Sequence, residues 1–235
     1  MKTNFIPALN NRKPIAQKGR KGEHKEVDKK VKVGALVGSG IGIATSLGIM
    51  YAEAKKGKPF LKGISEKNII TLGGLSILGG LVGGITTDKQ SNRKAKLREA
   101  IQQFGGNILA PIGTLALSLK LFEDKLVKLP LFKPEAKHLS KLNPLIKELP
   151  RTALIISSLI LGTTIGNFFT NKLNNRIFKD KQERKVEAKD FSAHIDDICY
   201  QSSLIFKSPQ ILNVTSKAIP LAFMIPGYET GTRQS

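Results

Sequence analysis

The densest group of chemically capable side chains lies toward the C-terminal end of the chain, at His194, Asp196, Asp197, Cys199 and Tyr200. Imidazole, carboxylate and thiolate groups are the usual zinc ligands and the usual nucleophiles and bases of enzymes. On a helix, His194 and Asp197 share a face, because residues three apart are neighbours, and Asp196 adjoins Cys199 and Tyr200, so this arrangement puts only two ligands on one side. A metal site needs three or four converging ligands, and a cysteine nucleophile needs a base beside it. The pattern therefore predicts an ordinary polar helix face, with no metal ligand and no catalytic residue.

The glycine-rich stretch 34–48 is the other motif that could be mistaken for a binding site, in this case a dinucleotide loop. That fingerprint needs a preceding strand and an acidic residue that binds the ribose. A polar, basic segment precedes Gly34 instead. We therefore expect no cofactor and no enzymatic activity.

Four stretches of about twenty residues contain no charged side chain, and lysines and arginines flank each of them. At a rise of 1.5 Å per residue, a helix of this length is about 30 Å long, which matches the hydrocarbon core of a bilayer. No histidine lies in the four stretches, and ionisable groups inside a membrane usually mark ion or proton pathways. We therefore expect an all-α integral membrane protein with four to five membrane helices and little sign of coupled transport. The stretches are 33–52, 68–87, 100–119 and 152–171.

Small residues recur every four positions in three of these stretches, so that they line one face of each helix. In lipid, close approach of helix backbones is a main source of association, because apolar burial gives little drive there. The spacing is similar to that of glycine-zipper membrane proteins in general and indicates no particular family. The predicted helix-packing residues are Gly34, Gly38, Gly42, Gly79, Gly80, Gly83, Gly84, Gly162 and Gly166.

The third stretch is the least apolar of the four. Gln102, Gln103 and Asn107 make its first half polar, and Pro111 removes a helical hydrogen bond and predicts a kink. We favour full spanning, and a re-entrant or interfacial helix is the alternative. Pro150 predicts the start of the fourth helix. The stretch 208–228, which contains two prolines, is a candidate for a fifth membrane element.

The rest of the chain is basic and polar. Residues 1–30 have too few large apolar side chains to offset chain entropy, which predicts a disordered basic N-terminal arm. Lysines alternate with leucines and prolines in 120–149, as suits an amphipathic linker on the membrane surface. The predicted organisation is an arm at 1–30, a helical membrane domain at 31–228 with units 65–119 and 150–228 joined by the linker 120–149, and a tail at 229–235.

An internal repeat relates residues 78–93 to residues 161–176, which are identical at seven of sixteen positions. Downstream, Ala95-Lys96 and Ala188-Lys189 echo each other. Membrane folds are often built by duplication, so we interpret the match as a duplicated helical unit. The alternative is two helices of similar composition that end at the same interface.

The formal charge of +20, with 38 Lys and Arg against 18 Asp and Glu, is concentrated between the apolar stretches. Basic loops around apolar spans are typical of membrane proteins that face anionic lipid headgroups. Nucleic acid is a less favoured partner, because aromatic residues are only 6% of the chain and tryptophan is absent. The lipid bilayer is therefore the expected partner.

No residue identifies an activity, so the sequence predicts only a broad functional class. The leading class is a non-enzymatic membrane protein with a structural or assembly role, in which glycine faces allow a homo-oligomer. One alternative is a small transporter or pore built from a duplicated unit, whose polar lining would be Gln102, Gln103, Asn107 and Asn167. Another is a basic peripheral module that binds anionic lipid or nucleic acid.

The distribution of basic residues predicts a cytoplasmic N-terminus. If the third stretch spans, one side holds 10 basic residues through Lys32, 5 in 88–103 and 7 in 171–203, which makes 22. The opposite side holds 5 in 53–67 and 8 in 120–151, which makes 13. An excess of Lys and Arg in short loops marks the cytoplasmic face.

Single cysteines at Ser91, Ser140 and Gln182, in a Cys199→Ser background, test this topology with a membrane-impermeant thiol reagent on intact cells. We expect labelling at position 140 alone. Labelling at positions 91 and 182 but not 140 would invert the topology, and a difference between 91 and 182 would mean that the third stretch does not cross.

Overall fold

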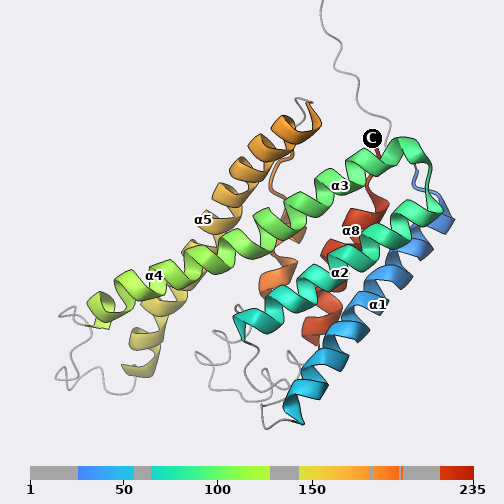
Figure 1. Cartoon of the computed structure of the whole chain (residues 1–235). Coiled ribbons are helices and arrows are strands. Elements are labelled where there is room, and N and C mark those ends of the chain that lie inside the picture. Colours follow the sequence, from blue (N-terminus) through green and yellow to red (C-terminus); the bar gives the residue numbers. More distant parts are fainter. Residues whose placement is uncertain (1–25, 56–64, 128–142, 180–182, 196, 198–217) are drawn as a thin grey trace, which may run out of the picture.

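The computed structural model describes residues 26–55, 65–127, 143–179, 183–195, 197 and 218–235, with only the backbone at 123–127 and 143–148. Within these ranges the chain is helical apart from short connections and contains no strand, which confirms the all-α prediction (Figure 1). The elements in chain order are α1 (Lys29–Ala54), α2 (Glu66–Thr87), η1 (Gln90–Asn92), α3 (Arg93–Ile101), η2 (Gln102–Leu109), α4 (Ala110–Val127), α5 (Asn143–Phe178), η5 (Ala188–His194) and α8 (Met224–Thr232).

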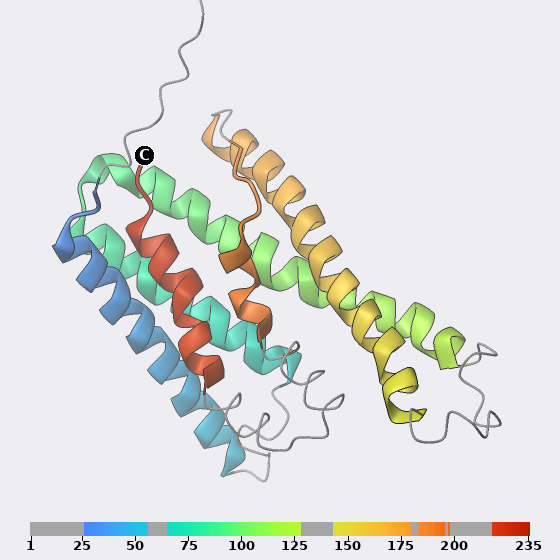
Figure 2. The same cartoon turned by 180° about the vertical axis from the view of Figure 1, so that it is seen from behind.

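Four helices of the described chain are long and apolar enough to cross a membrane, at Lys29–Ala54, Glu66–Thr87, Gln90–Phe122 and Leu149–Phe178. Each contains one of the four stretches predicted from the sequence, and the third is again the least apolar. Figures 1 and 2 show α1 and α2 side by side, with the long helix α3–η2–α4 crossing beside α2 and with α5 packed against α4.

The helices α1, α2 and α8 pack with their backbones in contact. A Cβ atom on Gly38 would overlap the carbonyl oxygen of Gly79, and a Cβ on Gly79 would overlap that of Gly38. On the other side of α2, a Cβ on Gly80 would overlap the carbonyl oxygen of Gly227 in α8. Only glycine permits so close an approach, so these crossings depend on residue type as well as on shape.

The other predicted packing glycines lie at helix crossings too. Gly34 and Gly42 face α2, Gly83 faces α1, and Gly84 faces α8. Gly162 lies against Pro111 and Thr114 of α4, and Gly166 lies against Gly106 of η2 and Ala110 of α4. Whether the same faces also mediate oligomerisation stays a prediction.

Two serines provide the polar contacts at the centre of the three-helix group. The hydroxyls of Ser39 and Ser76 are 2.7 Å apart and both side chains are fully buried. Ser76 donates to the carbonyl oxygen of Phe223 at 2.6 Å, and Ser39 donates to that of Met224 at 3.1 Å. These bonds attach the first turn of α8 to α1 and α2 and give the buried hydroxyls partners in an apolar setting.

The third helix is continuous from Arg93 to Val127, and Pro111 does not end it. The eight residues before Ala110 form a π-helix, η2, in which the backbone N–H of Ala110 donates to the carbonyl of Gly105. Proline cannot donate to the carbonyl four residues earlier, that of Asn107. A π-helical segment thus lies just before Pro111, and π-helical segments often occur at functional sites.

The predicted start of the fourth helix at Pro150 is wrong, because α5 begins at Asn143 and carries Pro150 inside it. The proline that marks the start of α5 is Pro144. It lies in the first turn, where backbone N–H groups have no partner within the helix, so a residue without an N–H is tolerated. At the other end, Lys179 takes a left-handed φ of 51°, a common way to end a helix.

The predicted linker 120–149 is helical at both ends, because α4 continues to Val127 and α5 starts at Asn143. The candidate fifth membrane element, 208–228, lies outside the described residues up to residue 217. Most of the predicted N-terminal arm also lies outside them. The helix α8 has nine residues, or about 14 Å, and it extends into the predicted tail 229–235.

The backbone contacts predict that replacing different glycines changes the stability of the protein by very different amounts. Gly83→Leu and Gly166→Leu should each destabilise the protein by about 3 kcal/mol or more, since the new side chain would meet the carbonyl oxygens of Gly34 and Gly106. Gly48→Leu is the matched control, because no atom lies within 4 Å of a Cβ built there. Thermal melting in detergent measures the effect, and equal melting of all three variants would refute the packing argument.

Candidate functional site

The third helix carries a buried polar stripe formed by Glu99, Gln103 and Asn107, four residues apart. Their exposed fractions are 4%, 1% and 1%. The amide of Gln103 donates to Oε1 of Glu99 at 2.8 Å, and the amide of Asn107 donates to Oε1 of Gln103 at 2.9 Å. The stripe is therefore a continuous hydrogen-bonded chain along one helix face.

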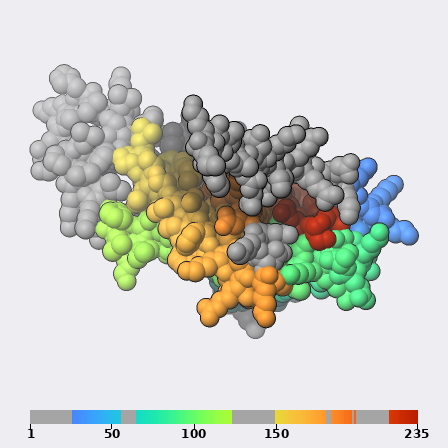
Figure 3. Space-filling view, turned by 90° about the horizontal axis from the view of Figure 1, so that it is seen from above, coloured from blue at the N-terminus to red at the C-terminus, as the bar shows by residue number. Residues whose placement is uncertain are grey.

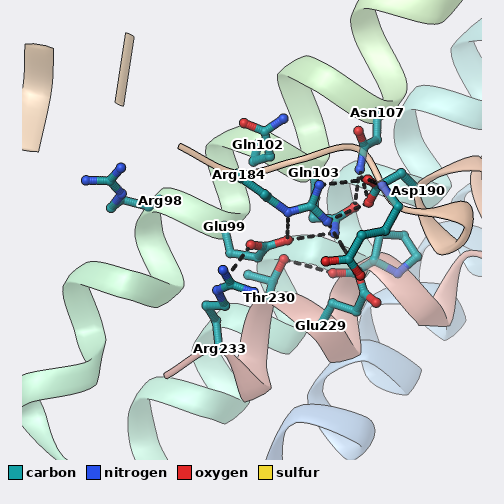
Figure 4. Close-up of polar contacts among 12 residues, drawn as sticks. Arg98, Glu99, Gln102, Gln103, Asn107, Arg184, Asp190, Glu229, Thr230 and Arg233 are labelled. Atoms are coloured by element: carbon teal, nitrogen blue, oxygen red, sulfur yellow. Dashed lines mark hydrogen bonds and ion pairs between the residues drawn. The ribbon is translucent and has the colours of Figure 1, made fainter. Parts of the chain in front are cut away.

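Arg184, from the connection after α5, binds this stripe (Figure 4). Its two terminal nitrogens lie 2.7 and 2.5 Å from the two carboxylate oxygens of Asp190, a bidentate pair. Its Nε lies 3.0 Å from Oε1 of Glu99. Asn107 donates to Asp190 at 2.9 Å, so the pair is also joined to the stripe. The Arg184 side chain is only 9% exposed and joins two segments far apart in sequence.

The last helix contributes a third carboxylate, Glu229. Its Oε2 accepts from the amide of Gln103 at 2.7 Å and lies 3.8 Å from Arg184, and its Oε1 lies 3.0 Å from Nζ of Lys189. Arg233 adds a cation 3.6 Å from Glu99. Lys189 also lies 2.9 Å from Glu187, so the four carboxylates of Glu99, Asp190, Glu229 and Glu187 face the three cations. A buried ion cluster tolerates desolvation only when its charges are closely paired.

The cations of the connection keep their charge despite burial. Burial alone would lower the pKa of Arg184, but the hydrogen bond to Asp190 and the charges of Glu99, Asp190 and Glu229 raise it above the usual value. Burial alone would also lower the pKa of Lys189. The hydrogen bonds and charges of Glu187 and Glu229 outweigh this effect, so the pKa of Lys189 is raised. Both side chains are therefore charged at any physiological pH.

Three amide side chains hold the backbone of Arg184 against α5 and η2. Asn171 donates to the Arg184 carbonyl at 2.8 Å and accepts from its N–H at 3.1 Å, while Asn167 donates to the same carbonyl at 2.9 Å. Gln102 donates to Asn167 at 2.6 Å. All four residues expected to line a polar path, Gln102, Gln103, Asn107 and Asn167, therefore lie in one network and bond to protein groups.

His194 closes the network at the end of η5. Its Nε2 lies 2.8 Å from the carbonyl oxygen of Asn107, the group to which Pro111 cannot donate. A carbonyl only accepts, so Nε2 carries the proton. Nδ1 of His194 lies 3.7 Å from Asp197, and the sequence predicted that these two residues share a face.

The other members of that sequence cluster, Asp196, Cys199 and Tyr200, lie outside the described residues. Over the ranges that are described, no group of three or more His, Cys, Asp or Glu side chains could hold a metal ion.

Lys96 forms a second buried polar centre, where the C-terminal ends of α2 and α8 meet. The side chain is fully buried, with Nζ 2.7 Å from Oδ2 of Asp88, 2.5 Å from the carbonyl of Gly231 and 3.0 Å from that of Arg233. A lysine at the end of a helix satisfies carbonyls that have no helical donor. Lys96 therefore caps α8 and ties it to the connection between α2 and α3.

A cavity of about 320 Å³ lies beside the ion cluster, between α3, α5, the connection after α5 and the C-terminal residues. Its wall includes Arg98, Asn174, Glu183, Arg184 and Arg233. Figure 3 views the molecule from this end, where the start of α3 (green), the end of α5 (orange) and the C-terminal segment (red) gather. The walls are mainly polar and charged, unlike the apolar faces of the helices.

Most of the cluster was missed from the sequence, because Glu99, Arg184, Asp190 and Glu229 stand among many other charges in regions interpreted as loops or tail. One signal was available: the repeat matched Lys96 with Lys189. Both lysines bind the end of α8, since Lys96 contacts Gly231 and Arg233 while Lys189 contacts Glu229.

The repeat also has matched contacts within its helices. The hydroxyls of Thr87 and Thr170 each donate at 2.7 Å to the carbonyl four residues earlier, that of Gly83 and Gly166. Both glycines in turn lie at a helix crossing against another glycine. The contacts agree with a duplication, which stays a prediction.

Comparison with known proteins yields no match to a protein-family model, to a curated protein or to a solved structure.

The ion cluster predicts a strong dependence on Arg184. Arg184→Gln should destabilise the protein by about 3–5 kcal/mol, because Asp190 would be left buried without its cation and Glu99 would keep only Arg233, 3.6 Å away. Lys185→Gln removes an exposed charge from the next residue and should have little effect. Unfolding in mixed detergent micelles measures both, and equal stability of the two variants would contradict the assignment.

The contact of Asp88 with Lys96 predicts an acid-sensitive stability. Burial would raise the pKa of Asp88, but hydrogen bonds from Lys96, Asn92 and the Lys89 backbone lower it from 3.8 to about 2. A depressed folded-state pKa stabilises the protein above about pH 4 and loses that contribution as the pH falls toward 2. The contribution is about 2 kcal/mol.

Melting of the parent and of Asp88→Asn between pH 6 and pH 2 tests the effect. The parent should be more stable at pH 6, and the difference should shrink as the pH approaches 2. A difference that is constant over this range would show that the Asp88 carboxylate does not titrate with the expected shift.

Proposed function

We propose that the protein is a multi-pass membrane protein with a structural or assembly role and no catalytic activity. Four helices long and apolar enough to cross a membrane support this class. So does the surface of these helices, on which large apolar side chains such as Val37, Ile41, Leu78, Val82 and Phe168 are more than half exposed. Lipid hydrocarbon is the environment that would cover them.

The observation that carries the structural role is that the buried polar groups are used to hold helices together. Arg184 is surrounded by carboxylates, and Gln102 and Gln103 bond to side chains of other elements. Such a network fixes one arrangement of α3, α5 and α8, as a scaffold requires. A conducting path would instead need polar groups that face water.

The arrangement of the helices supports the proposed topology. Gly34 lies beside Thr87, and Asn174 donates to the backbone of Arg98, so the start of α1, the connection after α2 and the end of α5 lie at one end of the molecule. These are the segments with the larger number of basic residues. We therefore place this end on the cytoplasmic side, where anionic headgroups are the expected contacts.

A transporter or pore is the second candidate, and one observation favours it. The polar stripe from Glu99 to Asn107 leads inward from the cavity along about 12 Å of the third helix. A rearrangement that released Arg184 would open this stripe to the cavity. The apolar surface of α1, α2 and α5 weighs against a third candidate, a basic peripheral module.

Two measurements separate the candidates. Alkaline carbonate extraction should leave the protein in the membrane pellet, and its release into the supernatant would refute the membrane class. Liposomes containing the purified protein should show no more ion or small-solute flux than empty liposomes. Flux that Arg184→Gln increases and Lys185→Gln does not would favour the transporter over the structural role.

A further inference from the structure

The polar cavity lies at the depth of lipid headgroups. Arg98 lies two residues before the third apolar stretch, and Asn174 lies three residues after the fourth, so both flank the predicted hydrocarbon region. Headgroups occupy this interfacial layer at each membrane face. A cavity of about 320 Å³ here has room for a small polar group.

The wall of the cavity offers groups of both signs. Arg233 is 47% exposed and contacts Glu99 only at 3.6 Å, so its guanidinium has donors to spare. Arg98 adds a second guanidinium, placed by a hydrogen bond to Asn175 at 3.1 Å. Guanidinium groups suit phosphate, because their planar donors match its oxygens. Glu183 supplies an exposed carboxylate on the same wall.

A buried acceptor lies beside the cavity. Asn174 is 3% exposed, and its amide donates to the carbonyl of Arg98 at 3.1 Å. This bond fixes the amide orientation, since a flipped amide would place two acceptors together. The Oδ1 atom therefore points away from this carbonyl and has no partner among the described residues, and it exposes almost no surface. A donor in the cavity would reach it only after a local shift of the wall.

The outside of α5 provides an apolar track next to the cavity. Phe169, Leu173 and Ile177 are spaced four apart and are 60%, 48% and 52% exposed. Ile177 is three residues from Asn174, so the two side chains lie on neighbouring faces of the helix. Of the three, Phe169 lies within the fourth apolar stretch, so the chain of an amphiphile with its polar end in the cavity would find an apolar surface at Phe169.

We propose that this cavity binds the headgroup of a phospholipid that carries a primary amine, as phosphatidylethanolamine does. The phosphate binds the arginines of the wall, the ammonium group donates to Glu183, and an acyl chain runs from the cavity toward the hydrocarbon region past Phe169. The proposal rests on the membrane insertion proposed above. Carbonate extraction tests that insertion separately, so that a failure of one is distinguishable from a failure of the other.

The test measures lipid binding to the full-length protein in dodecyl maltoside by native mass spectrometry and by the shift in melting temperature. The probes are dioleoyl phosphatidylethanolamine, the phosphatidylcholine and phosphatidylglycerol with the same chains, and water-soluble O-phosphoethanolamine. We expect roughly ten-fold tighter binding of phosphatidylethanolamine than of phosphatidylcholine, whose quaternary amine has no N–H to donate. Phosphatidylglycerol should also bind more weakly, because it carries no ammonium group.

Variants on the exposed part of the wall test the single side chains, and melting of each variant without lipid shows whether the loss of a cation near Glu99 in Arg233→Gln alters folding. Arg233→Gln should weaken binding of phosphatidylethanolamine roughly ten-fold, and Glu183→Gln should remove the preference over phosphatidylglycerol. Arg176→Gln is the matched control, since Arg176 is an exposed arginine of α5 outside the cavity wall. Equal binding of the three lipids, or equal losses in Arg233→Gln and Arg176→Gln, would overturn the proposal and leave water as the occupant. Binding of O-phosphoethanolamine as tight as that of the lipid would overturn the role of the membrane as its source.

Discussion

The guanidinium of Arg184 is the interaction on which the arrangement of the helices depends. It binds Asp190 through both terminal nitrogens and lies within ion-pair distance of Glu99 and Glu229, so that the connection after α5, the third helix and α8 meet at one side chain. The side chains of Arg184, Glu99 and Asp190 are almost fully buried, so little water can replace these partners. The three elements must therefore keep their relative positions or leave charges unpaired, which is costly.

The glycine contacts hold α1, α2 and α8 together on the other side of the molecule. Apolar helices in lipid gain little from burying more apolar surface, so α1 and α2 associate through direct backbone approach at Gly38 and Gly79. The same helix α2 accepts α8 at Gly80, which brings Glu229 toward the third helix. Backbone packing thus positions the carboxylate that the ion cluster uses.

The sequence was sufficient to predict the helices but only part of the candidate site. Four uncharged stretches of bilayer length and glycines at four-residue spacing predict which segments are helical and which faces approach, because both signals are local. The start of α5 was predicted at the wrong proline, since Pro144 and Pro150 carry the same local signal. The partners of Arg184 could not be predicted, because residues 99, 190 and 229 meet only through long-range packing. Their charges look the same in the sequence as those of exposed loops.

A double-mutant cycle between Arg184 and Asp190 tests the central claim most directly. Arg184→Gln, Asp190→Asn and the combined variant are unfolded in the same detergent mixture, together with the parent. If the two side chains form one buried pair, the double variant should cost about 2 kcal/mol less than the sum of the single variants, because each single change leaves the other charge unpaired. Free-energy changes that add to within about 0.5 kcal/mol would show that the two groups act independently, and the ion cluster would then not hold these helices together.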